Sequence, residues 1–242
     1  MNILGALERH ETFKSKFITA RNVDVWCPPG YFENIEECYP VIYMHDGQNL
    51  FDSAMAFGGS GWEIDKTISQ LMDDKKFRGA MVVGIWNTDI RWREYMPQKP
   101  YQSLALERHH ENFINTSGGE PISDAYLRFL VEELKPFIDS NYQALSDQPN
   151  TFVMGSSMGG LVSLYAISEY PDILAAPAVF RRIGQQVNLN WCVKWRKTCQ
   201  TQKHISCILI TARKDWTRCM DRIKSKWMNI SGTLAMWKTR IG

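Results

Sequence analysis

The chain has 242 residues, of which 44% are hydrophobic and 22% are charged. This length suits one α/β domain with its own core, and the composition excludes an intrinsically disordered chain. No apolar run approaches the roughly 18 residues that a membrane-spanning helix requires. Residues 1–16 mix apolar with charged residues and do not resemble a signal peptide. We therefore expect a soluble, globular, cytoplasmic protein.

The net charge of +2 conceals a division within the chain. Residues 1–173 contain 14 Lys and Arg against 24 Asp and Glu, whereas residues 174–242 contain 14 against 2. The second segment also holds four of the six Cys and five of the nine Trp, and it has no Tyr. Such a shift is typical of a second domain or of a basic nucleic-acid-binding arm. A change of reading frame is a third explanation.

Short β-rich runs alternate with helical stretches through residues 20–173, as in a mostly parallel sheet covered by helices. Strands are predicted at residues 23–27, 40–45, 80–86 and 151–154. Helices are predicted at residues 63–72, 123–138 and 158–170. Ser123 is the expected N-cap of the second helix, and Pro171 ends the third.

The clearest chemical signal is Gly155-Ser-Ser-Met-Gly159, a Gly-x-Ser-x-Gly pattern centred on Ser157 between a predicted strand and a predicted helix. Such a turn is so tight that side chains two positions either side of the serine would collide with neighbouring backbone. The turn exposes the serine hydroxyl, and the backbone N–H of Met158 at the helix N-terminus faces a developing oxyanion. This context favours a nucleophile elbow over a chance match.

A second polar loop, residues 45–49, follows an earlier predicted strand. Nucleophile-elbow folds take their second oxyanion donor from such a loop, and the backbone N–H of Gln48 is the expected donor. His45 precedes the nucleophile in the chain and ends a strand. A structural role is therefore favoured for His45 over a catalytic one.

Five segments together resemble a known family. They are VIYMHDGQNLFD at 41–52, GWEID at 61–65, VVGIWNT at 82–88, REYMP at 93–97 and GSSMGG at 155–160. Over residues 17–173 the chain resembles the esterase family of α/β-hydrolases that includes esterase D-like and enterochelin esterase-like enzymes. The resemblance implies hydrolysis of carboxylic esters through an acyl-enzyme. It also implies that Ser157 is the nucleophile and that the amides of Gln48 and Met158 form the oxyanion hole.

The catalytic acid and histidine that Ser157 needs are not found. In this fold they follow the nucleophile in the order acid, then histidine. His204 is the only histidine after Ser157, and Asp172 precedes it but ends the helix after the nucleophile, which is too early for the acid. Asp215 and Asp221 follow the histidine. No standard triad can be drawn, and serine without a base is a poor nucleophile.

A shift of one base restores the resemblance after Ile173. In the shifted frame, each new codon consists of the third base of one codon and the first two bases of the next. Because third bases are partly free, the possible translations include GGAGCVSTHWP over residues 174–185, DYGTKGLDALYGPYQ over 209–224 and GHVENTDW over 234–242. These resemble the family's continuation and its acid-bearing and histidine-bearing segments. Trp216 forces the aspartate of GLD, and Met236 with Trp237 forces the valine and glutamate. We hypothesise a one-base deletion near codon 174, followed by out-of-frame translation to an accidental stop and loss of the last strands of the sheet.

Residues 174–242 have two other interpretations. Basic and tryptophan side chains suit phosphate contacts and base stacking, but they form no helical stripe or known module, so a nucleic-acid partner is not favoured. A metal site is not favoured either, because the candidate ligands contain no Cys-x-x-Cys pair. Those candidates are Cys192, Cys199, His204, Cys207 and Cys219. The apolar run 205–211 is expected to resemble a strand.

Several other polar residues have two interpretations. His109 and His110 lie in a polar stretch and are expected in solvent. A group after the predicted strand 80–86 is either exposed loop, the commoner case, or in contact with substrate, because α/β sites form at that end. The group is Trp86, Arg91, Arg93 and Glu94.

The sequence thus predicts an α/β-hydrolase core over residues 1–173 and an anomalous basic segment over residues 174–242 that is a remnant of the same domain. The predicted function is serine-dependent hydrolysis of a small-molecule carboxylic ester, without metal or other cofactor and without a membrane partner. The alternative is an inactive, frameshifted remnant that lacks the acid and histidine. The acyl and alcohol parts of the substrate and the oligomeric state have no signal in the sequence.

Overall fold

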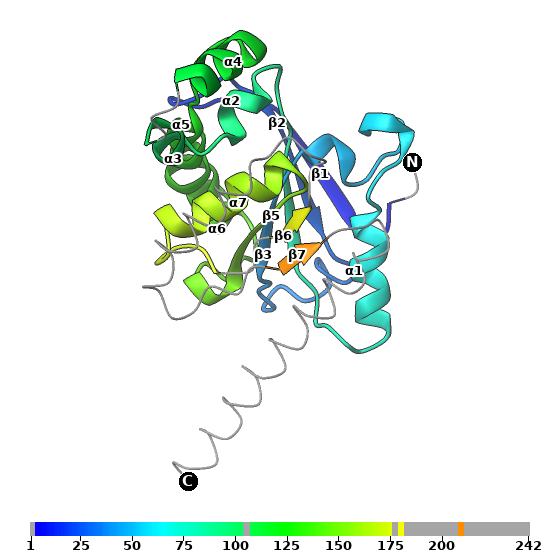
Figure 1. The fold of residues 1–242 in the computed structure, drawn as a ribbon. Helices are drawn as coiled ribbons and strands as arrows, with labels where there is room; N and C mark the ends of the chain where they lie inside the picture. The colour runs from blue at the N-terminus through cyan, green and yellow to red at the C-terminus, as the bar shows by residue number, and fades with distance from the viewer. Residues whose placement is uncertain (1–2, 104–106, 176–178, 182–207, 211–242) are drawn as a thin grey trace.

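The computed structural model describes residues 3–103, 107–175, 179–181 and 208–210. A five-stranded mixed sheet with helices on both faces dominates them (Figure 1). Its strands are β1 (Ala6–Phe13), β2 (Arg21–Cys27), β3 (Val41–His45), β4 (Met81–Ile85) and β5 (Thr151–Met154), in the order β1-β2-β4-β3-β5. β3 is parallel to β4 and β5, and β2 is antiparallel to β1 and β4. The predicted α/β class is confirmed.

The four strands predicted from the sequence are present as β2, β3, β4 and β5. Every residue of β3, β4 and β5 is buried, because helices cover both faces of this part of the sheet. β1 was not predicted. It is an edge strand with no fully buried residue and with Glu8, Arg9 and Glu11 in its middle, so it lacks an apolar pattern.

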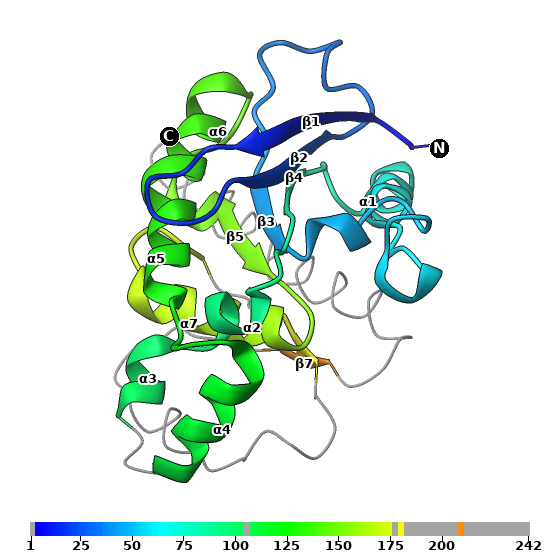
Figure 2. The same cartoon turned by 90° about the horizontal axis from the view of Figure 1, so that it is seen from above.

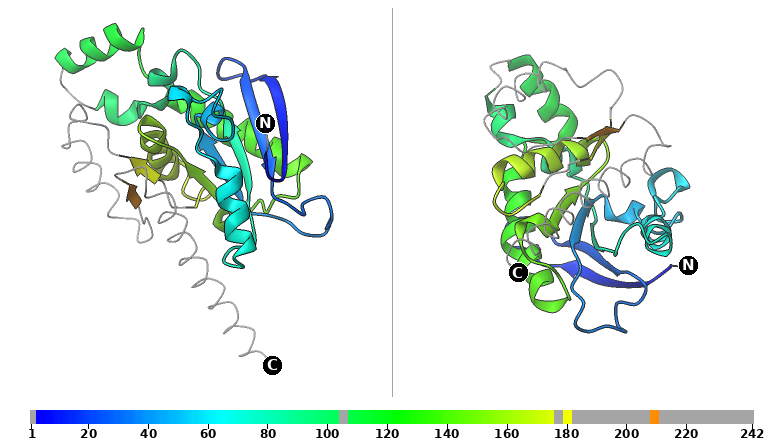
Figure 3. Two further views of the ribbon diagram at one scale, coloured as in Figure 1. Left: turned by 90° about the vertical axis from the view of Figure 1, so that its right-hand side faces the viewer. Right: turned by 90° about the horizontal axis from the view of Figure 1, so that it is seen from below.

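The apolar core lies in two layers, one on each side of the sheet. Helix α1 (Ile64–Asp73) covers one face, and α5 (Ser123–Arg128), α6 (Lys135–Asn141) and α7 (Met158–Glu169) cover the other, as Figure 1 and the view from below in Figure 3 show. Side chains of β3 alternate between the layers, since successive strand residues point to opposite faces. Tyr43 joins the layer with Leu127 and Val162, whereas Ile42 joins the layer with Ile68.

The helix predicted at 123–138 is helical from Ser123 to Asn141, with a π-helical stretch, Phe129–Leu134, between α5 and α6. Pro136 follows this stretch and has no N–H to donate, so the wider turn accommodates it. The predicted N-cap is wrong: Ile122 occupies that position, and the Ser123 hydroxyl instead accepts the backbone N–H of Gln98 at 2.9 Å.

Three helices between β4 and α5 were not predicted: α2 (Arg91–Tyr95), α3 (Gln98–Gln102) and α4 (Glu107–Ser117). The short helical turns Gly47–Asn49, Phe57–Gly59 and Gln148–Asn150 complete the fold. His110, expected in solvent, is half-buried, and its ring stacks on Tyr101 with centroids 4.3 Å apart. The side chain of His109 lies outside the described part of the structure.

The start of the anomalous segment still packs as part of the domain. Leu174 and Ala175 are buried, and the Ala175 N–H donates to the Thr151 carbonyl at 2.7 Å beside β5. Strands β6 (Val179–Arg181) and β7 (Ile208–Ile210) pair in parallel as a separate sheet, and β7 lies within the apolar run 205–211. Among the described residues the main sheet ends at β5, apart from an isolated bridge between Phe152 and Ala175.

The remaining candidates in residues 174–242 fall outside the described ranges. These are Cys192, Cys199, His204, Cys207, Asp215, Cys219 and Asp221. The division into residues 1–173 and 174–242 therefore stays a prediction. In the described ranges, no helix has both the length and the apolar character needed to cross a membrane.

Candidate active site

The candidate site lies where β3, β4 and β5 end on the same edge of the sheet. Figure 2 looks onto this edge, with the start of α7 close to α2. Parallel strands bring the loops that follow them together, which is why α/β proteins place ligands there. The segments that meet are the turn Gly47–Asn49 after β3, the residues from Trp86 to α2 after β4, and Gly155 to Ser157 after β5.

Ser157 occupies a strained turn between β5 and α7. Its backbone angles are φ 60° and ψ −123°, which side-chain-bearing residues rarely adopt. A Cβ added to Gly155 would lie 2.5 Å from the carbonyl carbon of Gly159, so position 155 accepts only glycine without backbone movement. The backbone thus has the geometry expected of a nucleophile elbow, and Ser157 is half-buried at its tip.

The first turn of α7 packs directly against the end of β3. A Cβ added to Gly159 would lie 3.3 Å from the His45 Cβ and 3.4 Å from the Asp46 Oδ2. The second glycine of the motif therefore brings the elbow against the loop that contains Gln48. This close approach joins the two segments that were expected to form one site.

The predicted oxyanion donors, Gln48 and Met158, both lie at this edge. Neither backbone N–H donates a hydrogen bond to another residue in the described ranges. Met158 is the first residue of α7, where unpaired N–H groups and the helix dipole favour a negative charge. The Gln48 side chain is held away from this role, since its Oε1 accepts the Asn87 N–H at 3.2 Å.

A buried carboxylate, Asp46, organises the loop after β3. Its Oδ1 accepts from Arg91 Nε and Asn87 Nδ2, each at 2.6 Å, and its Oδ2 accepts from Arg91 Nη2 at 2.7 Å. Burial is the largest single influence on the pKa of Arg91 and lowers it, but the hydrogen bonds to Asp46 and the attraction of its charge, with smaller contributions from Tyr95 and Tyr126, together raise the pKa. Arg91, expected in an exposed loop or against substrate, is paired with Asp46.

Glu94 is also not an exposed loop residue. It is fully buried and forms an ion pair with Arg21, Nη1 to Oε2 at 3.0 Å and Nη2 to Oε1 at 2.5 Å. The guanidinium of Arg21 lies 5.5 Å from the centroid of the Tyr126 ring. This pair fastens β2 to α2, so Glu94 supports the loop after β4.

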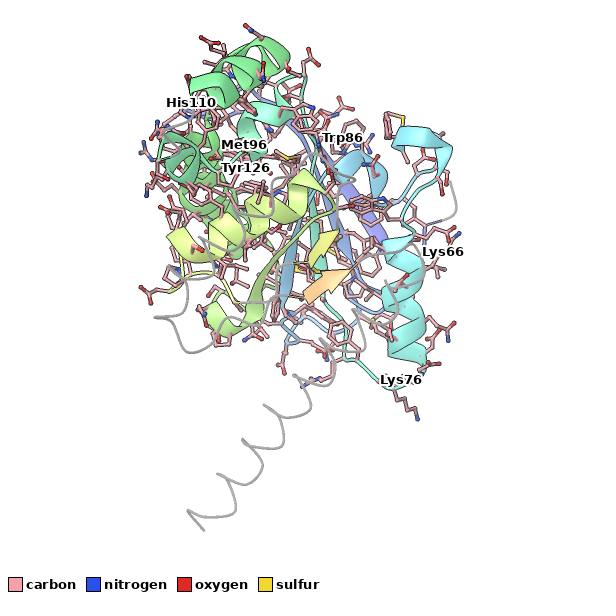
Figure 4. The ribbon with its side chains drawn as sticks, viewed as in Figure 1. Lys66, Lys76, Trp86, Met96, His110 and Tyr126 are labelled. Carbon is pink, nitrogen blue, oxygen red and sulfur yellow. The ribbon has the colours of Figure 1, made fainter. Side chains whose placement is uncertain are left out.

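Trp86 and Arg93 likewise have protein partners. Trp86 Nε1 donates to Asp24 Oδ2 at 2.9 Å, and Arg9 lies 4.6 Å from the Trp86 ring centroid. Arg93 Nε donates to the Glu120 carbonyl at 2.8 Å. Figure 4 labels Trp86 and Tyr126 near the site end of the molecule, and Lys66 on α1 on the other side of the sheet.

The described histidine side chains are all engaged away from Ser157. The histidine side chains that the structure describes, His10, His45 and His110, contact Tyr142, Tyr126 and Tyr101. No histidine among them hydrogen-bonds to Ser157. Within the same part of the chain, no cluster of three or more His, Cys, Asp or Glu side chains could hold a metal ion.

The elbow and the strand order define the class: the fold is that of an α/β-hydrolase. Residues 15–208 match the family model described as "Esterase: Putative esterase", so the chain belongs to this esterase family. The match extends beyond residue 173, where the sequence resemblance was expected to end.

Two relatives and one solved structure are similar to this chain. YbbA of Bacillus subtilis, an uncharacterized protein, is 23% identical over 187 residues, which are 77% of this chain and 62% of YbbA. Ferri-bacillibactin esterase BesA of the same organism is 29% identical over 141 residues, covering 55% of this chain and 44% of BesA. The chain therefore spans less than two thirds of the length of these relatives. The structure of an IroE-like serine hydrolase from Shewanella oneidensis superposes with a TM-score of 0.57 at 17% identity, covering 90% of this chain and 77% of the other.

Proposed function

We propose that this chain is a serine hydrolase of carboxylic esters with Ser157 as its nucleophile. The observation that carries the proposal is the strained backbone of Ser157, φ 60° and ψ −123°, directly before the Met158 N–H, which donates to no residue in the described ranges. Such strain persists only where the surrounding structure enforces it, and it is common at catalytic residues.

The proposed reaction proceeds through an acyl-enzyme. The Ser157 oxygen attacks the ester carbonyl carbon, the alcohol leaves, and water then releases the acid from the serine. The N–H groups of Gln48 and Met158 stabilise the negative oxygen of the tetrahedral intermediates. A general base must accept the proton of Ser157, and none of the histidines whose side chains are described hydrogen-bonds to it.

A small-molecule ester is the proposed substrate. The description of the relative BesA as a ferri-bacillibactin esterase supports an ester substrate here. Elbow and oxyanion donors contact only the scissile group, so they do not select the acyl or alcohol part.

Turnover of p-nitrophenyl acetate by the full chain tests the proposal. Ser157→Ala should abolish turnover above the buffer rate, and Ser156→Ala is the matched control, since it removes a neighbouring half-buried hydroxyl. Equal rates for the wild type and Ser157→Ala would refute serine-dependent hydrolysis by this chain.

A second candidate is an inactive remnant with a deleted base near codon 174. The reversal from acidic to basic composition after residue 173 favours it, and none of the histidines whose side chains are described hydrogen-bonds to Ser157. Sequencing the gene across codons 165–185 and beyond is the test. An additional nucleotide in this region would identify residues 174–242 as a sequencing artefact. The corrected protein should then hydrolyse esters, with its catalytic acid and histidine restored. If the gene lacks this nucleotide, and if wild type and Ser157→Ala hydrolyse the ester at equal rates, the chain is the inactive remnant.

A further inference from the structure

The backbone of Asp46 has a left-handed conformation. Asp46 is the first residue after β3, is 2% exposed, and has φ 61° and ψ 47°. This left-handed conformation is uncommon for residues that carry a side chain, although aspartate adopts it more readily than most. Interactions with the rest of the protein must therefore stabilise it.

Those interactions come from the segment after β4. Arg91 and Asn87 give the carboxylate three hydrogen bonds of 2.6–2.7 Å, and the Asp46 N–H donates to the Tyr95 hydroxyl at 3.3 Å. Arg91 is in turn fixed over the Tyr95 ring, 4.9 Å from its centroid. Both the backbone and the side chain of Asp46 are thus tied to one neighbouring segment.

Asp46 also lies beside both segments that contribute to the proposed oxyanion hole. Its carbonyl accepts the Asn49 N–H at 2.9 Å, which closes the turn that contains Gln48. On the other side, a Cβ on Gly159, one residue after Met158, would be 3.4 Å from its Oδ2. Rotation of Asp46 would therefore move the Gln48 N–H relative to the Met158 N–H.

We propose that Asp46 and Arg91 are positioning residues that orient the Gln48 N–H towards the developing oxyanion. This inference rests on the proposed function. Oxyanion donors act only when they are pre-oriented, and a displacement of about 1 Å can cost about 100-fold in rate. The Asp46–Arg91 pair acts through the turn and does not touch the substrate.

The protein contains a matched pair that separates positioning from general stability. Arg9 and Asp24 also form two hydrogen bonds, at 2.7 and 2.9 Å, and Arg9 also lies over an aromatic ring. Their exposures are similar, 33% and 2% against 23% and 3% for Arg91 and Asp46. Among the described residues, Arg9 contacts Asp24 and Trp86 and not the turn Gly47–Asn49, so Arg9→Gln is the control.

The first test compares an ester with its thionoester in the full-length chain. Asp46→Asn keeps the shape but weakens the pairing, so we expect kcat for p-nitrophenyl acetate to fall about 10- to 100-fold with KM little changed. The thionoester, whose sulfur is a weaker acceptor, should lose less. Arg9→Gln should leave the ratio of the two rates unchanged. Equal losses for both substrates in Asp46→Asn, or the same change in Arg9→Gln, would overturn the inference.

The second test does not need turnover, so it separates failure of this inference from failure of the proposed function. Amide hydrogen exchange at Asn49 should become at least about 10-fold faster in Asp46→Asn and unchanged in Arg9→Gln, because only the first change loosens the turn. Arg91→Lys is the milder variant if Asp46→Asn does not fold. Unchanged exchange at Asn49 would refute the positioning role. A wild type without Ser157-dependent turnover would refute only the proposed function.

Discussion

The imidazole Nδ1 of His45 lies 2.7 Å from the hydroxyl of Tyr126, at the last residue of β3 and one position before Asp46. Burial lowers the pKa of His45 from 6.5 to about 3, and the charge of Asp46 only partly opposes this effect. His45 is therefore neutral in the folded protein near neutral pH. Its buried position and tyrosine partner support the structural role favoured by the sequence.

Acid should destabilise the protein through His45. The folded state binds a proton less readily than the unfolded state, so stability falls as the pH drops from about 6.5 towards about 3, by about 1.4 kcal/mol per pH unit. His45→Gln removes this titration. Urea unfolding at pH 7 and pH 5 should show a loss about 2 kcal/mol smaller in His45→Gln than in wild type. An equal loss in both proteins would contradict the assignment.

Glycine at position 155 should be essential for folding of the elbow. An alanine Cβ would lie 2.5 Å from the backbone of Gly159, so Gly155→Ala should lower the free energy of unfolding by about 3 kcal/mol. Gly58→Ala is the control, because its Cβ meets nothing within 4 Å and only the positive φ is strained, at about 1 kcal/mol. Denaturant titration measures both, and similar losses would show that the predicted clash is relieved by a small backbone shift.

The Arg21–Glu94 pair should matter far more than a surface pair. Glu94→Ala leaves a buried guanidinium without its carboxylate and should cost about 3–5 kcal/mol of unfolding free energy. Glu132→Ala breaks the exposed pair with Arg128 and should have no measurable effect. Thermal unfolding of the two variants provides the comparison. A minor effect of Glu94→Ala would mean that water reaches Arg21 easily.

Restoration of the reading frame should stabilise the domain. On the frameshift hypothesis, residues after 173 were not selected to cover the sheet, and a domain rests on a margin of only about 5–15 kcal/mol. A gene with one base inserted at codon 174 should therefore give a protein with a higher denaturation midpoint and Ser157-dependent esterase activity. No gain in midpoint or activity would argue against the deletion.

Most of the central sheet and the elbow could be predicted because their signals are local. Continuous apolar runs predicted β3, β4 and β5, which are buried on both faces. β1 and the helices α2, α3 and α4 were missed. β1 is half polar because it lies at the sheet edge, and α2 and α3 have only five residues each, too few for a helical period to show.

Buried charges were the other failure of sequence reasoning. Glu94 and Arg91 were predicted in an exposed loop, because charged side chains are seldom buried without a partner. Their partners are remote in the chain: Arg91 is 45 residues from Asp46, and Glu94 is 73 residues from Arg21. A sequence pattern of short period does not report such pairs.

By itself, the sequence determined the alternation of strands and helices, the glycine-bracketed Ser157 and the change of character after residue 173, because each depends on residues adjacent in the chain. Only the tertiary structure decided that Arg91 and Asn87 donate hydrogen bonds to the Asp46 carboxylate and that Gly159 packs on His45. These contacts follow from the strand order β1-β2-β4-β3-β5, which sets the loops after β3, β4 and β5 side by side. Sequence spacing determines which elements form, whereas packing of the sheet determines which of their ends meet.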